Sequence, residues 1–313
     1  MTDDIMSVDE GSGALESAPS LISPLVSSTT SVNAPTVLRV LLGTQLRRLR
    51  ESRGISAQDA ARAIRASESK ISRIELGRNA VREVDIADLL SLYEVDDDER
   101  RQLLTLAGQA NQQGWWHQYQ DVLPAWFQAY LGLEESADYI RSFDTQFVPG
   151  LLQTGEYAAA VLRLGPFTLE ETDRMVYLRT ERQRRFAAGG LRLWAIIDEV
   201  ALRRPVGGRA VMRRQLQHLL ELSGQPRLTI QLSPCLTGAS YAAPGSFNIL
   251  TFVTDDLPDI VYVEQLTSAI YLDKRVDVER YTAAMDQISA AATTPEETTD
   301  FIRSLLAELG ESE

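Results

Sequence analysis

The chain has 313 residues, a formal net charge of −13 and 44% apolar residues, which predicts two domains with ordinary apolar cores. No apolar run is long enough to cross a membrane, and no basic stretch precedes a short apolar one near the N-terminus. These absences argue against a membrane anchor and a signal peptide, so we expect no membrane partner.

Residues 1–36 are rich in Ser, Thr, Asp and Gly, with only short apolar patches. This composition is typical of a disordered tail. The single cysteine, Cys235, excludes an intrachain disulfide and favours a cytoplasmic protein. We expect Cys235 to be a small buried apolar residue rather than a sensor thiol.

The first predicted helix follows this tail. Its apolar stripe consists of Leu38, Leu42, Leu46 and Leu49, and its other sides carry Arg47, Arg48 and Arg50. Two shorter helices, residues 56–64 and 67–76, are joined only by Arg65 and Ala66. Two short helices with such a tight link are typical of a helix-turn-helix unit.

Both short helices begin at a serine. Ser56, with Asp59 three residues later, predicts an approximate capping box, and Ser67 is the N-cap expected for the next helix. Gly77 then ends that helix. Ile71 and Ile74 predict its buried side, with Lys70 and Glu68 flanking the opposite, outward side. The expected outward residues are Ser69, Ser72, Arg73 and Leu76.

This segment is basic, although the chain is acidic. Residues 39–82 contain eleven Arg or Lys and four Asp or Glu, a net charge of +7, so the rest of the chain carries −20. A basic segment in an acidic protein favours contact with a polyanion at that segment alone. The alternative is a small helical bundle with solvated charges. We favour double-stranded DNA as the partner.

The segment resembles a known family. Residues 54–56, Ala61 and the run SESKISRIELG at 67–77 resemble the phage-repressor type of helix-turn-helix, the Xre class. Further on, residues 114–163, 198–208 and 261–273 resemble the C-terminal domain of actinobacterial antitoxin-like transcriptional regulators. The resemblance implies DNA binding by the N-terminal domain, while the role of the C-terminal domain in that family is poorly defined.

The resemblance also implies particular contacts. The base-reading positions of the family fall on Glu68, Ser69 and Arg73, with Ser72 nearby. Phosphate contacts would come from Lys70, from Arg78 and from the amide end of the helix at Ser56 and Ala57. Arg73 can bind guanine through two hydrogen bonds, and Glu68 can accept one from cytosine. Glu68 alternatively only complements the helix dipole.

Two further positions relate to this family. Arg50 and Glu75 match a pair that forms an internal salt bridge in its members. Glu75 lies beside the predicted buried face, where a carboxylate needs a partner. The central turn departs from the family pattern, because Arg65 stands where its members usually have glycine. We therefore expect strain or a different geometry in this turn.

Two more helices, residues 82–93 and 96–110, complete the predicted DNA-binding domain, 37–110. An aromatic segment follows, and its candidate effector or interface residues are Trp115, Trp116, Trp126 and Tyr130. This cluster fits a core between domains or the wall of an effector pocket.

The remainder, residues 111–313, mixes strands and helices. Predicted strands are 191–197, 227–232, 247–253 and 260–264, and predicted helices are 173–186, 209–222, 276–291 and 295–309. This pattern predicts an α+β domain for dimerisation and for binding an effector or partner. The overall fold class is therefore multidomain, an all-α helix-turn-helix domain followed by an α+β domain.

Catalysis is not indicated. The sequence has two histidines and no metal-ligand spacing, phosphate loop or nucleophile elbow, so we expect no enzyme, cofactor or metal. Glu264 lies in an otherwise apolar strand. We expect it either to pair with an arginine such as Arg203 or to bind a ligand. We expect a homodimeric transcriptional regulator, cytoplasmic and on the nucleoid when DNA-bound. We expect its C-terminal domain to sense a small molecule or a protein partner. Alternatively, the C-terminal domain neutralises a small partner protein, and DNA binding regulates expression of the protein itself.

Overall fold

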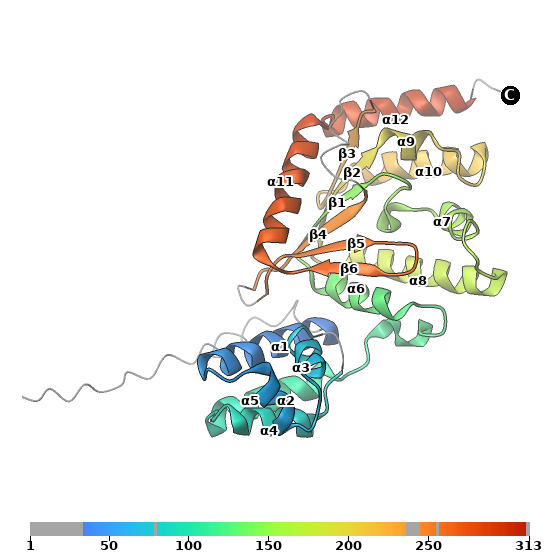
Figure 1. Cartoon of the computed structure of the whole chain (residues 1–313). Coiled ribbons are helices and arrows are strands. Elements are labelled where there is room, and N and C mark those ends of the chain that lie inside the picture. The colour runs from blue at the N-terminus through green and yellow to red at the C-terminus, as the bar shows by residue number, and fades with distance from the viewer. Residues whose placement is uncertain (1–33, 78–79, 236–244, 255–256, 311–313) are drawn as a thin grey trace, which may run out of the picture.

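The computed structural model describes residues 34–77, 80–235, 245–254 and 257–310, which form an all-helical N-terminal domain and a C-terminal domain built around a sheet (Figure 1). The helices of the N-terminal domain are α1 (Pro35–Ser52), α2 (Ala57–Ala63), α3 (Glu68–Glu75), α4 (Glu83–Leu92) and α5 (Asp97–Ala110). Helix α1 begins with Pro35, a favoured first residue, two positions before the expected domain boundary. The expected tail, 1–36, otherwise lies outside the described residues.

One core holds the N-terminal domain together. It contains the predicted Ile71 and Ile74 of α3 and side chains of the other four helices, including Leu42, Leu46, Ala60, Ala61, Ile86, Leu89, Leu90 and Leu103. The stripe predicted for α1 is divided, however. Leu42 and Leu46 face this core, Leu49 is half-buried at its margin, and Leu38 packs into the core of the C-terminal domain. Helix α1 therefore belongs to both cores.

The C-terminal domain contains one mixed sheet in the order β3-β2-β1-β4-β5-β6. Its strands are β1 (Tyr139–Asp144), β2 (Arg192–Asp198), β3 (Leu228–Ser233), β4 (Phe247–Thr251), β5 (Ile260–Glu264) and β6 (Ala269–Leu272). Strands β1, β2 and β3 are parallel, whereas β4, β5 and β6 continue the sheet in antiparallel pairs from β1. The carboxyl ends of three parallel strands thus lie at one edge of the sheet, where ligands bind in many open α/β sheets.

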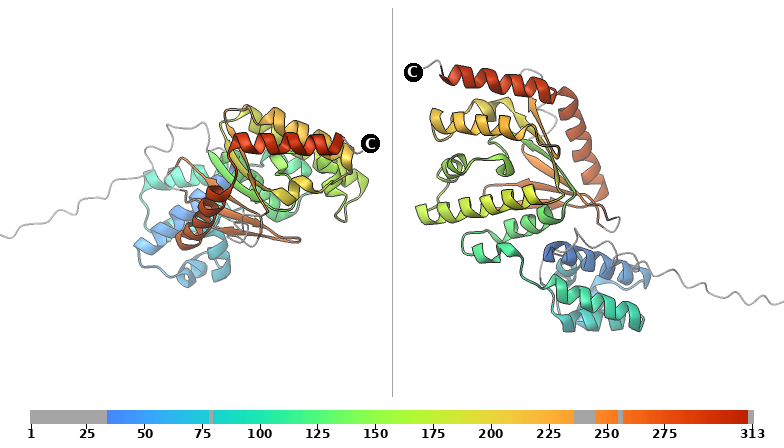
Figure 2. Two further views of the ribbon diagram at one scale, coloured as in Figure 1. Left: turned by 90° about the horizontal axis from the view of Figure 1, so that it is seen from above. Right: turned by 180° about the vertical axis from the view of Figure 1, so that it is seen from behind.

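Helices cover both faces of this sheet (Figures 1 and 2). The helices of this domain are η1 (Trp115–Tyr119), α6 (Ala125–Ser136), η2 (Gly150–Leu152), α7 (Gly155–Leu162), α8 (Leu169–Ala188), α9 (Glu199–Arg203), α10 (Arg209–Leu222), α11 (Arg275–Ala291) and α12 (Pro295–Gly310). Helix α11 packs Met285 and Ile288 against Phe143 and Phe247 on one face. The larger core lies on the other face, where α10 buries Met212, Leu216 and Leu219 as predicted.

The sequence prediction missed several elements. The predicted strands correspond to β2, β3, β4 and β5, but β1 and β6 were not expected, nor were the helices α6, α7 and α9. Strand β1 was missed because its sequence, YIRSFD, places Ser142 and Asp144 on the face that carries Ile140. A strand with polar residues on its buried face lacks the alternation by which strands are recognised.

The two domains contact each other through α1 and α6. Val37, Leu38 and Leu41 of α1 share a core with Tyr130 and Leu133 of α6. Gly132 of α6 lies so close to α1 that a methyl group added there would be 2.4 Å from Thr36 Oγ1. This close approach needs a residue without a side chain at position 132.

No helix in the described part of the chain is both long and apolar enough to span a bilayer. The prediction for Cys235 was wrong: its side chain is exposed, and its amide donates to Glu199 Oε2 at 3.2 Å. Cys235 lies two residues after the end of β3, where the chain leaves the sheet, so the core does not cover it.

Candidate nucleic-acid interface

The turn between α2 and α3 is a Schellman motif. The amide of Ala66 donates to Ala61 O at 2.9 Å, and the amide of Arg65 donates to Arg62 O at 3.1 Å. Arg65 has φ +52°, in the left-handed region that glycine tolerates best. The strain expected from the missing glycine is therefore present at Arg65, whose side chain is exposed.

The starts of α2 and α3 differ. Ser56 caps α2, because its Oγ accepts from the amide of Asp59 at 3.1 Å. The capping box is incomplete, since the Asp59 carboxylate accepts from the Ser56 hydroxyl rather than from its amide. Ser67 occupies the N-cap position of α3 but makes no capping bond; its hydroxyl lies 2.9 Å from that of Ser69. The first amides of α3 therefore lack a cap from Ser67.

Helix α3 has one buried and one exposed face. Ile71 and Ile74 anchor it in the domain core. The predicted base-reading residues are all exposed: Glu68, Ser69, Ser72 and Arg73. Arg73 donates from Nε to Ser69 O at 3.2 Å, which leaves the outer nitrogens of its guanidinium without a bond to a described residue. The geometry offers Arg73 and three shorter polar side chains to a partner outside the domain.

Arg50 and Glu75 form the ion pair expected from the sequence. The guanidinium donates to both carboxylate oxygens, at 2.6 and 3.0 Å, and also to Ile55 O at 2.9 Å. The hydrogen bond to Glu75 raises the pKa of Arg50. Both side chains are mostly buried, 12% and 8% exposed. The pair joins the end of α1 to the end of α3 and so fixes the direction of α3.

Lys70 has a partner that sequence reasoning missed. Its Nζ lies 2.7 Å from Oδ2 of Asp85 on α4, and Arg82 donates to both oxygens of the same carboxylate, at 3.1 and 2.6 Å. Asp85 is almost completely buried, and the hydrogen bonds from Arg82 and then Lys70 lower its pKa. One carboxylate thus orients two cations beside α3, and Arg82 joins the candidate interface.

These cations surround a shallow hollow of about 370 Å³, a volume that includes open solvent. Its lining consists of Lys70, Arg73, Ile74, Ala80, Val81, Arg82 and Asp85. Arg78, the second predicted phosphate contact, lies outside the described residues. The exposed helix face and this hollow together form a polar surface with an excess of positive charge, which suits a nucleic-acid backbone.

The aromatic residues predicted for an effector site are mainly packed against other side chains in the core. Trp116 and Tyr130 are buried, whereas Trp115 and Trp126 are half-buried. Trp115 meets Trp116 edge to face at 5.8 Å, and Arg185 lies 4.5 Å from the Trp115 ring. A methyl group on Gly132 would lie 3.0 Å from Trp116, so this cluster supports the contact between α6 and α1.

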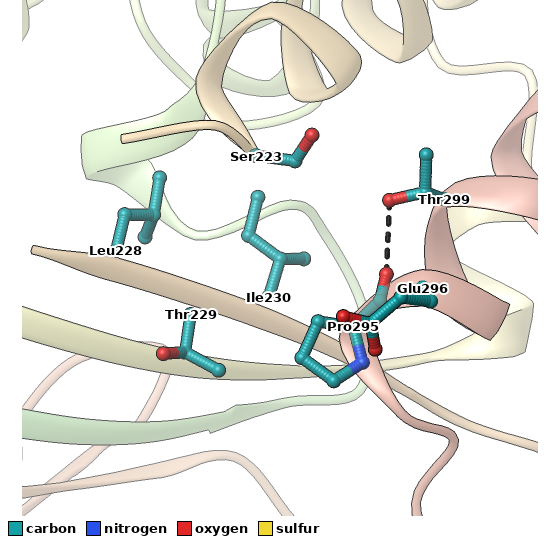
Figure 3. Close-up of a pocket in the computed structure, with 7 residues that line it drawn as sticks. All are labelled: Ser223, Leu228, Thr229, Ile230, Pro295, Glu296 and Thr299. Atoms are coloured by element: carbon teal, nitrogen blue, oxygen red, sulfur yellow. Dashed lines mark hydrogen bonds between the residues drawn. The ribbon is translucent and has the colours of Figure 1, made fainter. Parts of the chain in front are cut away.

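A second hollow, of about 420 Å³ including open solvent, lies between α10, β3 and α12 (Figure 3). Its lining residues are Ser223, Leu228, Thr229, Ile230, Pro295, Glu296 and Thr299. The hydrogen bond visible there, from Thr299 Oγ1 to Pro295 O at 2.9 Å, lies within the first turn of α12. None of the four predicted aromatic residues lines this hollow or the one beside α3.

The predicted pairing of Glu264 with Arg203 was wrong. Arg203 forms an ion pair with Glu199 at 2.6 Å. It belongs to α9, which directly follows β2, and β1 and β4 separate β2 from β5 in the sheet. Glu264 instead accepts from Tyr262 Oη at 2.9 Å. Within the described residues, no three His, Cys, Asp or Glu side chains gather as metal ligands would.

Two family models match the chain. The model described as "Helix-turn-helix domain" matches residues 41–103, and the model described as "Domain of unknown function (DUF5753)" matches residues 127–304. No curated protein and no solved structure matches. The first match runs from within α1 to the middle of α5, and the second spans the whole sheet.

Proposed function

Because the chain belongs to the family of the domain of unknown function DUF5753 and has a helix-turn-helix domain before it, we propose that it regulates transcription by binding a specific DNA sequence. The observation that carries this proposal is the exposed polar face of α3, held rigidly by the Arg50–Glu75 pair. A rigid helix with polar side chains on its outer face is suited to the major groove.

The guanidinium of Arg73 donates hydrogen bonds to O6 and N7 of a guanine, while Ser69, Ser72 and Glu68 contact neighbouring bases. Lys70 and Arg82 contact phosphates at the hollow beside α3, and the amide end of α2 at Ser56 and Ala57 contacts another. Asp85 neutralises part of the charge of Lys70 and Arg82 but holds both cations in place. In this proposal the outer face of α3 determines sequence preference, and the phosphate contacts beside it supply affinity for any DNA sequence.

We further propose an Xre-class, antitoxin-like regulator that binds as a homodimer, without enzymatic activity. Two copies of α3 would read half-sites about one helical turn apart. The C-terminal domain would change DNA affinity by binding a small molecule or a protein. Support for regulation comes from the contact between α6 and α1, which joins that domain directly to the DNA-binding unit.

A second candidate function is that of an antitoxin-like module that binds and neutralises a small protein. Large exposed apolar side chains after the end of α7 and in the first half of α8 favour it. Leu164, Leu169 and Tyr177 are each about 70% exposed. Exposed apolar side chains that gather in one region are common at sites that bind other proteins.

The test of DNA binding is selection of bound fragments from genomic DNA by the full-length protein. An enriched motif is expected, with affinity that falls steeply as salt rises. Arg73→Ala should weaken binding by about 1–3 kcal/mol and relax preference at one base position. Arg184→Ala, at an exposed arginine of α8, is the matched control and should bind as the wild type does.

Lys70→Ala should instead weaken binding to all sequences alike, with thermal stability measured alongside because Lys70 also neutralises Asp85. No enriched motif, together with unchanged binding by Arg73→Ala, would refute the proposal.

A further inference from the structure

The sheet of the C-terminal domain ends in β3 on one side and in β6 on the other (Figure 1), and the β3 edge is closed. The amide of Leu232 donates to the hydroxyls of Thr293 and Thr298, at 3.2 and 3.1 Å. The carbonyl of Leu232 accepts from the amide of Thr293 at 2.9 Å. Helix α12 begins directly beside the same strand (Figure 3). A further strand therefore cannot be added to the sheet at β3.

The β6 edge is open. The turn between β5 and β6 closes with a 2.8 Å hydrogen bond from the amide of Gln265 to Ser268 O. In an antiparallel pair, residues then alternate between those whose backbone groups bond to the neighbouring strand and those whose groups point away. In β6 the amides and carbonyls of Ala269 and Tyr271 therefore point away from β5. None of these four groups has a hydrogen-bond partner among the described residues.

Helix α6 covers a face of β6 and leaves its edge accessible. The side chain of Tyr271 lies on the face that packs against α6, and its hydroxyl donates to Trp126 O at 2.6 Å. Ile270 lies on the opposite face, because successive side chains of a strand alternate. Neither proline nor a charged side chain occurs within β6 (AIYL), although both are common protection on exposed edge strands.

Exposed apolar side chains flank this edge at both ends. Leu266, in the turn before β6, is 96% exposed, and Val276, in the first turn of α11, is 59% exposed. Ile270, in the strand itself, is 48% exposed. Unpaired backbone groups and exposed apolar side chains thus occur together, as is typical of a surface that another strand covers.

We propose that β6 is the dimer interface of this protein and pairs with β6 of a second copy in antiparallel orientation. One copy offers a single open edge, since the β3 edge is closed. Two identical edges that pair about a two-fold axis close the assembly at two copies. The inference rests on the homodimer of the function proposed above and specifies the surface that forms it.

One register satisfies all four free backbone groups. It places Ile270 opposite Ile270 of the second copy, so that Ala269 of each copy exchanges two hydrogen bonds with Tyr271 of the other. A β-branched apolar pair then lies on the axis, and a small side chain lies beside each large ring. Because the two strands run in opposite directions, Leu266 of each copy comes close to Val276 of the other. The apolar side chains at the two ends thereby cover each other.

The first test is sedimentation velocity of the full-length protein without DNA, which makes it independent of DNA binding. The wild type should be a dimer. Ile270→Lys should weaken dimerisation by roughly tenfold or more, because two ammonium groups would face each other on the axis. Val200→Lys, at a 43% exposed side chain of α9 next to β2, is the matched control and should dimerise normally. Circular dichroism should show that both variants keep the helix content of the wild type.

The second test locates the axis by a disulfide. In a protein that carries Cys235→Ser, Ile270→Cys would bring two Cα atoms to about 4.5 Å, a distance that a disulfide can span. Mild oxidation should therefore link the two copies. Leu272→Cys is the matched control on the same strand, because the two copies of this residue would lie about 13 Å apart along the paired strands. It should not form the link.

A monomeric wild type would overturn the proposal. So would a dimer in which Ile270→Lys and Ile270→Cys behave as their controls do. A protein that dimerises only after residues 1–33 are removed would mean that this segment of the same chain occupies β6, and would also overturn it. Selection of DNA fragments by the same preparations measures DNA binding separately, so loss of this interface and loss of the proposed function are distinguishable.

Discussion

Arg65 is the residue at which the helix-turn-helix unit departs most clearly from favourable backbone geometry. Its backbone φ is +52°, a conformation that costs a residue with a side chain about 1 kcal/mol of folding free energy relative to glycine. Arg65→Gly should therefore raise the urea midpoint of unfolding. Arg62→Gly, three residues earlier in the last turn of α2, should lower it by a similar amount, since glycine weakens a helix. A lower midpoint for Arg65→Gly would contradict the strain inferred from its φ value.

The Arg50–Glu75 pair is the second prediction at the scale of a residue. Glu75→Gln should destabilise the N-terminal domain by about 3 kcal/mol, because it leaves a mostly buried guanidinium without its carboxylate. Arg47→Gln breaks only an exposed pair with Glu51 and should cost about 0.5 kcal/mol or less. Chemical denaturation of the full-length variants measures both. Equal losses for the two would show that burial does not strengthen the pair.

At the scale of elements, Gly132 sets the distance between α6 and α1. Gly132→Ala adds a methyl group 2.4 Å from Thr36 Oγ1, so the two helices must move apart. We expect a loss of about 1–3 kcal/mol and increased hydrogen exchange in the first turns of α1. Gly224→Ala, where nothing lies within 4 Å of an added methyl group, is the control. Unchanged exchange in α1 would mean that this contact does not hold the domains together.

Elements with regular apolar spacing were predicted well from the sequence. Helix α10 begins and ends at the predicted residues, and Ile71 and Ile74 are buried as expected. Strand β1, at the centre of the sheet, was missed because Ser142 and Asp144 interrupt its apolar pattern.

The candidate DNA interface was predicted only in part. Helical periodicity predicted Ser69, Ser72 and Arg73 on the outward face of α3 with Glu68 beside it, and the family resemblance assigned base contacts to these positions. All four side chains are exposed. Nothing in the sequence indicated that Lys70 would join Arg82 at Asp85, because Lys70 lies on α3 and Asp85 on α4. Such contacts depend on how α4 packs against its neighbours, which apolar spacing does not specify.

At the scale of the whole molecule, a fragment of residues 34–110 should retain the base preference of the full-length protein. It should also self-associate, because removal of α6 exposes the apolar side chains of Val37, Leu38 and Leu41. Sedimentation and DNA selection measure the two effects. The fragment with Leu38→Gln is the control and should remain more dispersed. Loss of base preference in a folded fragment would mean that the C-terminal domain contributes to recognition.

Helix α1 contributes to both apolar cores, and this has a consequence for folding cooperativity. If the C-terminal domain unfolded alone, one side of α1 would lose its cover and the other domain would be weakened as well. The two domains should therefore melt in a single transition rather than as independent units. Any molecule that binds only the native C-terminal domain would then also protect the DNA-binding domain against heat and proteases.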